Sequence, residues 1–568
     1  MAENLKVLNL TSCHQLSSTP DVSANRLLEV VLLKDCRNLD EIDTSICCLM
    51  NLVILNMSDC GRLKDLPSEI CLPSSLTSLC ACDCKSMVKL SSTSGGLRNL
   101  KTLRLYHCKS LEEIEGVDEK LDSLEIIGCK KLTEIHGIDR LENLKDFVIS
   151  GCESLERLPD LSNLRNLKGL TILDCKNLTQ FPGFGRLEML RELNISGCES
   201  LKRLPELSKN LKDVEIEGCK NLTEIHGVDG LEFLENFKII GCESLERLPD
   251  LSNLKNLKIL TIEGCKNLSE IHGIDKMEFL ENFEISGCES LEILPDLSKN
   301  LEGLTIKGCK NLTKIHGFDR WEFLENFEIS GCESLERLPD LSQLKKLKYL
   351  QIEGCKNLTE VHGVDELEFL EGLYIVGFES LERLPDLSNL KKLKDLKIEG
   401  CKILTEIQGV DTLESLQNLD ISGCESLEIL PDLSNLKELM ELKAKDCKKL
   451  TEIQAGNGLV SLTHFDVKGC ISLEKVPDLN KSDLLKLNNV SCWELTDISL
   501  LELLTDGGCT KLRLGLSNLP THCIISLYMR NLFKVRLWPF SIHLSSNESD
   551  FFAFKIESGF PRCAIFAI

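Results

Sequence analysis

The strongest constraint on this chain is the regular spacing of its cysteines. Twenty-one of the 29 cysteines follow a short apolar run, from Cys13 and Cys36 near the start to Cys470 and Cys492 near the end. The intervals are 21 to 24 residues, most often 23, apart from one interval of 46 residues whose midpoint is Phe378. A period this short and regular indicates a repeat protein in which each unit is one supersecondary element. We therefore expect about 22 repeats of ~23 residues.

Each cysteine belongs to the pattern Leu-x-x-Leu-x-Ile/Leu-x-x-Cys-x-x-Leu-x-x-Ile/Leu, as in the segment 257–271. This pattern resembles the leucine-rich repeat, with cysteine where many versions carry asparagine. In that repeat a strand and a return arm stack on their neighbours and bury one continuous core. The predicted fold class is an α/β-type solenoid, a leucine-rich-repeat horseshoe or superhelix with a parallel concave β-sheet. A small thiol suits a buried slot, and a ladder of free thiols indicates a reducing compartment.

Two kinds of repeat alternate and give a longer unit of 46 residues in most of the chain. One kind, here called the Pro-Asp repeat, reads Cys-Glu-Ser-Leu-Glu-Arg-Leu-Pro-Asp-Leu-Ser, as at 242–252. The other, the His-Gly repeat, reads Cys-Lys-Asn-Leu-Thr-Glu-Ile-His-Gly, as at 219–227. Proline removes an amide donor and disfavours helix in the residue before it. The convex side is therefore predicted to consist mostly of loops and short 3₁₀ turns.

The expected domain organisation has three parts. Residues 1–492 form the leucine-rich-repeat solenoid, residues 493–515 a weak terminal repeat or cap, and residues 516–568 a divergent tail. The tail contains Phe-Lys-Val-Arg-Leu-Trp-Pro-Phe-Ser-Ile-His-Leu, whose alternation is typical of short β-strands. We interpret this short β-rich C-terminal tail as a truncated post-repeat domain.

The composition of the chain disfavours two classes of binding partner, nucleic acid and membrane. The net charge of −24 disfavours nucleic acid and anionic membrane, because both are bound through basic surface. No apolar stretch approaches the ~18 residues of a membrane span. The chain begins Met-Ala-Glu-Asn-Leu-Lys, without a basic n-region or a long apolar segment, so no signal peptide is expected. We expect no nucleic-acid partner and no membrane partner.

No motif indicates an enzyme. A P-loop, a Gly-x-Gly-x-x-Gly, a Gly-x-Ser-x-Gly and a His-Glu-x-x-His are all missing from the sequence, so no catalytic, cofactor-binding or metal-binding residue is assigned.

Two clusters of residues can be compared with the requirements of a metal site. A column of histidines recurs on alternate repeats, ~10 Å apart and too distant to share a metal, and is interpreted as solvated: His136, His226, His272, His316 and His362.

The second cluster is Cys80-Ala-Cys82-Asp-Cys84. On a strand the first two thiols point to the same face, where they could bind a soft metal or be oxidised. No histidine or second cysteine pair lies nearby in the sequence to complete a metal site. A structural role for these cysteines is therefore the favoured interpretation.

The concave face, made by the strand residues that flank each buried aliphatic residue, is the most informative surface. Most repeats carry Glu, Ser, Thr, Lys or Asn there. The exceptions form two candidate protein-binding groups, which are Tyr106, Ile127, Val148 and Leu173 on four consecutive strands, and Tyr349, Tyr374 and Val376 on two. Aromatic and aliphatic side chains with a polar rim mark protein contact sites, although drift on a large surface gives the same pattern. Tyr374 is expected to be exposed.

The segments Leu-Pro-Asp-Leu-Ser-Asn-Leu-Lys and Cys-Lys-Asn-Leu-Thr-Glu-Ile-His-Gly resemble the repeat region of plant intracellular immune receptors. The likeness is to TIR-type nucleotide-binding leucine-rich-repeat (NLR) disease resistance proteins of the flax rust resistance kind, and it covers roughly residues 1–492. The resemblance implies a sensor region in the cytoplasm, or shared between nucleus and cytoplasm, that recognises a pathogen effector or a guarded host protein. It also implies that nucleotide-binding and TIR domains belong to a longer receptor; neither is in this chain, so no cofactor is expected.

An alternative from another class is a stand-alone scaffold or adaptor, such as a decoy or a substrate adaptor of a ubiquitin ligase. An F-box-like helical segment before the repeats would favour the ligase adaptor, and none is visible in the sequence. An enzyme is the least favoured interpretation.

Overall fold

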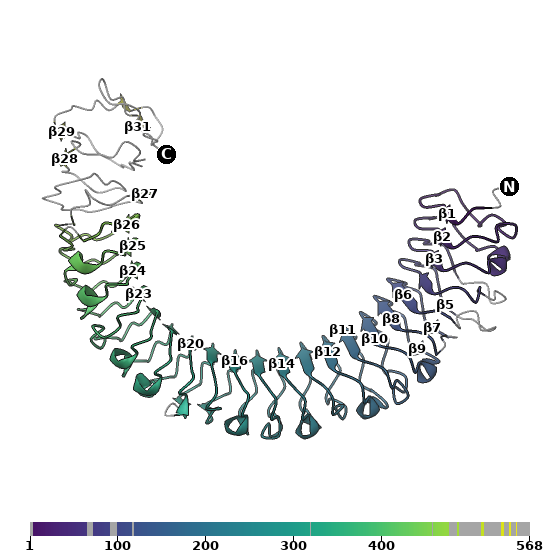
Figure 1. Cartoon of the computed structure of the whole chain (residues 1–568), viewed down its shortest axis with the longest axis horizontal. Coiled ribbons are helices and arrows are strands. Elements are labelled where there is room, and N and C mark those ends of the chain that lie inside the picture. The colour runs from purple at the N-terminus through teal and green to yellow at the C-terminus, as the bar shows by residue number, and fades with distance from the viewer. Residues whose placement is uncertain are drawn as a thin grey trace. The chain divides into compact units, whose positions relative to one another are not determined.

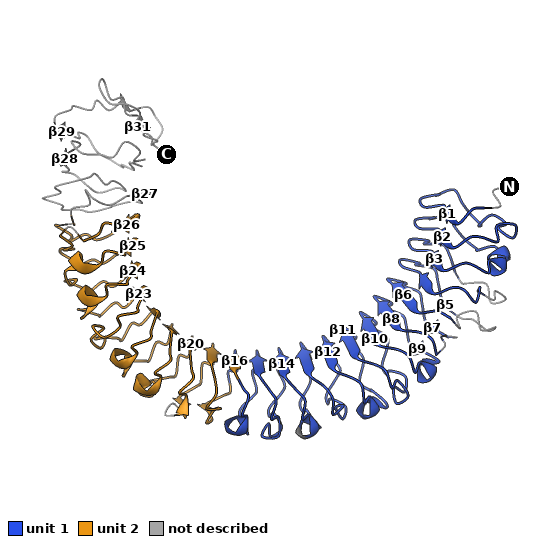
Figure 2. Cartoon of the chain, in the orientation of Figure 1, with its two compact units in different colours: residues 1–280, 286–289 blue, residues 281–285, 290–568 orange. Residues whose placement is uncertain are grey.

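The computed structural model describes residues 4–64, 72–90, 99–115, 117, 119–317, 320–456, 458–475 and 477, with the backbone of five short strands beyond them. The described chain forms two compact units, residues 1–280 with 286–289 and residues 281–285 with 290–568 (Figure 2). In each unit, successive repeats stack side by side, with the main-sheet strands on one side and the return arms on the other (Figure 1).

Parallel strands that pair in chain order form the main sheet of each unit. In the first unit these strands are β1 (Val7–Asn9), β2 (Val30–Leu32), β3 (Ile54–Asn56), β4 (Ser78–Cys80), β6 (Thr102–Tyr106), β8 (Ser123–Ile127), β10 (Asp146–Ser150), β11 (Gly169–Leu173), β12 (Glu192–Ser196), β13 (Asp213–Glu217), β14 (Asn236–Ile240) and β15 (Ile259–Glu263). In the second they are β16 (Asn282–Ser286, all but its last residue), β18 (Gly303–Lys307), β20 (Asn326–Ser330), β21 (Tyr349–Glu353), β22 (Gly372–Val376), β23 (Asp395–Glu399), β24 (Asn418–Asp420), β25 (Glu441–Lys443), β26 (His464–Asp466) and β27 (Lys486–Leu487).

The return arms contain only short elements. Two-residue parallel strands pair at β5 (Lys89–Leu90), β7 (Glu113–Ile114) and β9 (Glu134–Ile135), and at β17 (Ile293–Leu294) with β19 (Lys314–Ile315). Every helix of the described residues is a 3₁₀ turn of three to five residues, namely η1 (Thr44–Cys48), η2 (Ile138–Arg140), η3 (Phe184–Arg186), η4 (Val228–Gly230), η5 (Ile274–Lys276), η7 (Leu341–Gln343), η8 (Val364–Glu366), η9 (Val410–Thr412) and η10 (Leu433–Asn435). The predicted solenoid with a parallel sheet and loop or 3₁₀ return arms is confirmed.

The predicted cap at 493–515 and tail at 516–568 lie outside the described residues, apart from four short strands. These are β28 (Arg513–Gly515), β29 (Arg536–Trp538), β30 (Ser545–Ser546) and β31 (Phe552–Ala553). β28 pairs with β29 in parallel, and β30 pairs with β31 in antiparallel fashion.

The core follows the repeat pattern. In a five-residue strand the second and fourth side chains point inward, and Leu260 and Ile262 of β15 are 0% exposed. From Cys13 to Cys470, the residue before each slot takes a positive φ that ends the strand, such as Gly264 at 63° or Asp35 at 61°. This left-handed conformation favours glycine and tolerates aspartate, whose short polar side chain bonds locally. The pattern therefore sets both the buried face and the point where the chain leaves the sheet.

The two kinds of repeat fit one another on the return arms. In a Pro-Asp repeat the Asp250 carboxylate accepts a bond from the Ser252 amide at 2.9 Å, and the Leu251 amide donates to the His272 carbonyl of the next repeat at 3.1 Å. Gly273 has φ 86°, and a Cβ there would lie 2.3 Å from Asp250 Oδ1. Close approach of the two arms thus requires glycine in the following repeat. The same arrangement recurs at Asp160 and Gly183, Asp340 and Gly363, and Asp386 and Gly409.

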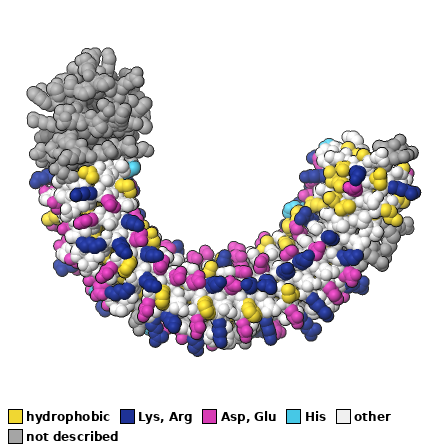
Figure 3. All heavy atoms as spheres, viewed as in Figure 1, with side chains coloured by type: hydrophobic (Ala, Val, Ile, Leu, Met, Phe, Trp, Pro, Cys, Tyr) yellow, Lys and Arg dark blue, Asp and Glu magenta, His cyan; other side chains and the backbone are white. Residues whose placement is uncertain are grey.

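Charged side chains of both signs alternate along the surface (Figure 3), despite the net charge of −24. Many ion pairs join neighbouring repeats just before the strands. Glu235 lies between Lys212 and Lys258 at 2.8 and 3.0 Å, and these lysines hold the pKa of its carboxyl at about 2. Lys348 and Glu325 form an equivalent pair at 2.7 Å. These pairs are solvent-exposed, so each adds little stability by itself.

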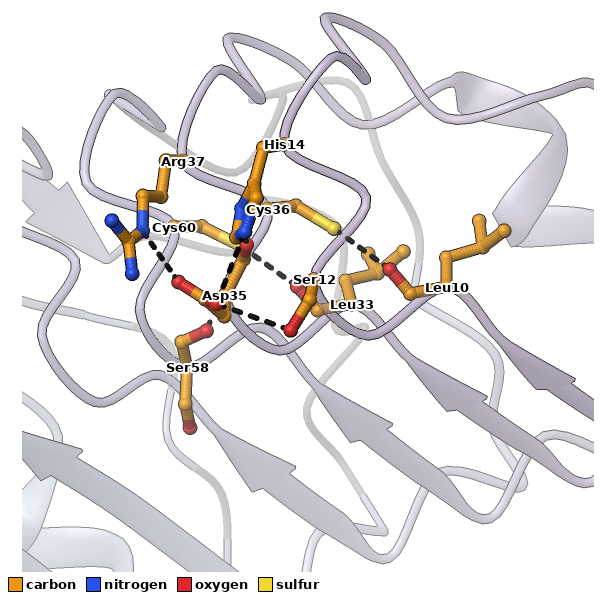
Figure 4. A network of polar contacts seen from close by, with 9 residues as sticks. All are labelled: Leu10, Ser12, His14, Leu33, Asp35, Cys36, Arg37, Ser58 and Cys60. Carbon is orange, nitrogen blue, oxygen red and sulfur yellow. Dashed lines mark hydrogen bonds and ion pairs between the residues drawn. The ribbon is translucent and has the colours of Figure 1, made fainter.

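The cysteine slots use the thiol as a donor to the neighbouring repeat. Cys36 donates to the Leu10 carbonyl and Cys60 to the Leu33 carbonyl, both at 3.1 Å (Figure 4). Beside them Asp35 accepts bonds from the Ser12 hydroxyl at 3.1 Å and from Arg37 Nε at 2.7 Å. Burial raises the pKa of the Cys60 thiol to about 12. No cysteine of the described residues forms a disulfide, and most of the ladder thiols are buried.

Candidate protein-binding surface

The concave face consists of three rows of side chains, from the first, third and fifth residues of each five-residue strand. Register pairs these residues between neighbouring strands, so that Tyr106 stands beside Ile127, and Ile127 beside Ser150. The residues of one row are therefore neighbours at the spacing of strands, ~4.8 Å. Which side chains form a patch depends on their row as much as on their strand.

The first predicted group occupies two of these rows. Tyr106, Ile127 and Leu173 share the fifth-residue row, interrupted by Ser150 of β10, and Val148 lies in the third-residue row. All four predicted side chains are half-buried. The group is thus a broken apolar line rather than one continuous patch.

A polar cluster borders this group on its N-terminal side. The Tyr106 hydroxyl donates to the Glu125 carboxylate, and Arg104 Nε contacts the same carboxylate at 3.2 Å. Burial and the Glu125 charge raise the pKa of Tyr106 to about 12. The hydrogen bond therefore restrains the ring of Tyr106, and its hydroxyl stays protonated.

The second predicted group is more tightly assembled. Tyr349 of β21 stands directly beside Gly372 of β22, and Tyr374 is two residues further along β22. A Cβ on Gly372 would lie 2.8 Å from Tyr349 Cδ1 and 2.8 Å from Tyr374 Cε2, so both rings converge over this glycine. Val376 continues the patch on the same strand and is half-buried. The result is a compact aromatic surface on two strands.

The exposure of the two tyrosines differs. Tyr349 is 43% exposed, whereas Tyr374 is half-buried rather than fully exposed as expected. The cause is its position over Gly372 and near Asp395, and this burial raises the pKa of Tyr374. Tyr349 thus presents a larger fraction of its surface to solvent than Tyr374 does.

A third apolar group was missed by sequence reasoning. Val7, Val30 and Ile54 share the first-residue row of β1 to β3, and Leu32 lies in the third-residue row beside them. Val7 is 50% and Ile54 38% exposed, and hydrophobic side chains gather near the N-terminal end in Figure 3. The available signal was the set of apolar residues at the variable positions of the first three Leu-x-x-Leu-x-Leu segments.

Exposed phenylalanines form a second missed feature, at the edge where the return arm enters the strand. They come from the segment Glu-Phe-Leu of the His-Gly repeats, and they are Phe233 and Phe279 in the first unit and Phe323 and Phe369 in the second. Lysines lie over two of the rings, with Lys346 Nζ 4.1 Å from the Phe323 centroid and Lys392 Nζ 3.9 Å from the Phe369 centroid. The repeated Glu-Phe pair was the signal for this column.

The two clusters considered for chemistry behave differently. Four of the column histidines bond the glutamate two residues earlier, as His226 does with Glu224 at 2.8 Å, and they are exposed. Cys80 and Cys82 lie on the concave face with their sulfur atoms 3.3 Å apart.

No group of three His, Cys, Asp or Glu side chains could hold a metal ion in the described part of the chain. In the same residues no helix is long and apolar enough to cross a membrane.

Comparison with protein families identifies the repeats as leucine-rich repeats, in agreement with the fold. A family profile described as a BspA type leucine rich repeat region matches in six copies, over residues 66–179, 104–216, 196–302 and 377–491. Together these segments span more than half of the chain. No curated protein matches the sequence.

Several solved structures are similar. A leucine-rich-repeat protein of Leptospira interrogans has a TM-score of 0.39 at 20% identity, covering 72% of this chain and 91% of that one. The functional domain of InlJ from Listeria monocytogenes, which includes a cysteine ladder, has a TM-score of 0.33 at 16% identity, covering 71% and 74%. The plant peptide hormone receptor RGFR1 in complex with RGF2 has a TM-score of 0.26 at 20% identity, covering 77% and 81%.

Proposed function

Because the chain belongs to the BspA-type leucine-rich repeat family, we propose that it is an interaction scaffold whose concave face binds a protein partner. Solenoids of this kind offer an extended sheet face for binding and are typically not catalytic. The observation that carries the proposal is the convergence of Tyr349 and Tyr374 over Gly372. Half-exposed aromatic side chains held in one conformation are typical of binding hot spots, since little entropy is lost when a partner covers them.

The finer form of this proposal is a sensor region of a plant intracellular immune receptor, which recognises a pathogen effector or a guarded host protein. Its support is the resemblance of the Pro-Asp and His-Gly repeats to the repeats of NLR receptors. In this proposal nucleotide-binding and TIR domains of a longer receptor would signal, and this chain would bind neither nucleotide nor nucleic acid. A cytoplasmic or nucleo-cytoplasmic location is proposed on the ladder of free thiols, which a reducing compartment preserves.

Site-specific photo-crosslinking tests the binding face. A photoreactive phenylalanine analogue would replace Tyr349 in one variant and Arg383, an exposed residue of the return arm, in a matched control. In an extract of cells that express the chain naturally, we expect one protein to be crosslinked from position 349 and not from position 383. Adding Tyr374→Ala should reduce that crosslink at least fivefold, which corresponds to about 1 kcal/mol of a hot spot. Equal labelling from both positions would contradict the proposed face.

A further inference from the structure

We propose that Cys80 and Cys82 form a redox-active dithiol on the concave face, which exchanges with low-molecular-weight or protein disulfides. The two thiols are the side chains at alternate positions of one extended segment, so both point to the same face. Their sulfur atoms are 3.3 Å apart, and the Ser58 hydroxyl lies 3.3 Å from the Cys80 sulfur. Both cysteines are partly exposed, unlike the buried Cys84 that follows them.

The backbone that carries the pair is held from both sides. The Met57 amide donates to the Cys80 carbonyl at 2.9 Å, and the Asp59 amide donates to the Cys82 carbonyl at 2.6 Å. On the other side, the Ala81 amide donates to the Arg104 carbonyl at 3.0 Å. These bonds hold the backbone of the segment extended, which keeps both side chains on the concave face. With the rotamers that the two cysteines adopt, their sulfur atoms lie next to each other, as a reaction that joins them requires.

The environment divides the two thiols into a nucleophile and a resolving group. The hydrogen bond from Cys82, aided by Ser58 and the charge of Arg104, lowers the pKa of Cys80 to about 6. The same contact raises the pKa of Cys82, and burial adds to this effect. A thiolate next to a protonated thiol is the arrangement in which one sulfur attacks and the other resolves.

The other charged and titratable groups around the pair come from the adjoining strands and turns. Tyr106 and Arg104 lie on β6, and Arg104 is itself paired with Glu125 of β8 at 3.2 Å. Asp59 and Asp83 occupy the left-handed turns at the ends of the neighbouring segments. Arg104 is the one positive charge among these groups, so its removal should weaken the Cys80 thiolate.

The reaction balances without any further reagent. The Cys80 thiolate attacks a disulfide RSSR, forms a Cys80–S–S–R bond and releases one RS⁻, which takes up a proton. With the thiolate consumed, the main cause that raises the pKa of Cys82 is gone, so Cys82 loses its proton and attacks the Cys80 sulfur. The second RSH leaves, and the products are one intramolecular disulfide and two RSH. The sulfur atoms must approach from 3.3 Å to about 2.05 Å. A disulfide between cysteines two residues apart on one extended segment is strained, so it should be readily reduced.

Oxidation of the whole reduced chain by glutathione disulfide at pH 7 tests the exchange. After quenching, alkylation under denaturing conditions and digestion, mass spectrometry should show the 80–84 peptide with two hydrogens fewer and Cys84 still alkylated. In Cys82→Ser the reaction should stop at a glutathione adduct on Cys80. A peptide that stays fully reduced, or an adduct that persists on Cys80 in the unaltered chain, would overturn the proposal.

The pH dependence separates this dithiol from two ordinary thiols. The pKa of Cys80 is near 6, against ~8.5 for an ordinary cysteine, so a larger fraction of Cys80 is thiolate at pH 7. A thiolate of lower pKa is also a weaker nucleophile, so the reaction of Cys80 at pH 7 is only about twofold faster. At pH 5.5 the same balance makes Cys80 react with a thiol reagent about 15-fold faster than an ordinary cysteine. The exposed Cys48 serves as the internal reference, and Cys48→Ser should leave the Cys80 profile unchanged. Arg104→Gln should move the midpoint upward. A Cys80 rate that rises only above pH 8 would refute the assignment.

Discussion

Replacing Phe378 by cysteine would restore the repeat consensus, and yet we expect it to destabilise the solenoid. Phe378 fills the only non-cysteine slot between Cys13 and Cys470 and is 0% exposed. Removing a buried phenylalanine down to alanine costs about 3–5 kcal/mol, and the cysteine sulfur recovers part of this, leaving about 2–4 kcal/mol. A new thiol could donate to the Ile352 carbonyl, as Cys424 donates to the Ile398 carbonyl at 3.2 Å. Such a bond returns about 1 kcal/mol, so the net loss is about 1–3 kcal/mol.

A local probe is needed, because long repeat arrays do not unfold in a single two-state step. Native-state hydrogen exchange of the strand amides in β21 to β23 should accelerate about 5- to 150-fold in Phe378→Cys, while exchange in the first unit stays unchanged. Phe378→Leu is the matched control, since it keeps most of the volume and should cost less than about 1.5 kcal/mol. Unchanged or slower exchange in Phe378→Cys would show that slot identity, and not the filled volume, governs stability there.

Three other predictions follow from the repeat contacts. The Glu235 carboxyl should titrate at about pH 2 by carbon-detected NMR, and Lys258→Met should raise this value. Because folding lowers the pKa of Glu235, its ion pairs stabilise the fold at pH values above ~4.3, the pKa of the unfolded carboxyl, and this contribution fades as the pH falls toward 2. A titration midpoint near pH 4.3 in the folded chain would contradict the pairing. Gly423→Ala should cost at least about 1–2 kcal/mol in local hydrogen exchange, because φ is 74° and the new Cβ would lie 3.2 Å from the Gly400 Cα; no loss would mean that the backbone relaxes freely. Asn256→Ala should cost about 0.5–1.5 kcal/mol by the same measurement, since its side chain donates to the Glu232 carbonyl of the preceding repeat at 2.6 Å; a neutral result would show that water replaces this bond.

The fold could be predicted from the sequence because the determinants of a repeat are local. The slots at Cys242 and Cys265 imply the buried residues between them, since each strand must turn the same face to the core. The proline of the Pro-Asp repeat likewise indicates a return arm without regular helix. The fit between neighbouring return arms could not be predicted in this way, because it depends on the contact between Gly273 of one repeat and Asp250 of the repeat before it.

The candidate surfaces were predicted less completely. The rows of the concave face follow from alternation, so Tyr349 and Tyr374 could be assigned to that face. Their convergence over Gly372 could not, because it depends on the register between β21 and β22 and on ring orientation. The proximity of the Cys80 and Cys82 sulfur atoms has the same origin, since side chains two apart on a strand meet only when their rotamers turn toward each other.

The pairing of unlike return arms constrains how such a chain can gain or lose length. Removing one Pro-Asp and one His-Gly repeat together, 46 residues, leaves every remaining junction of a kind already present. Removing a single His-Gly repeat instead brings two Pro-Asp arms together, so that Asp386 would face another aspartate at the position where Gly409 now leaves room for its carboxylate. Loss of one His-Gly repeat is thus opposed by steric and charge conflict, whereas loss of a Pro-Asp and a His-Gly repeat together is not. The near-identical copies along the chain recur mostly at 46 residues, which is the spacing expected if unequal crossing-over added or removed repeats in pairs.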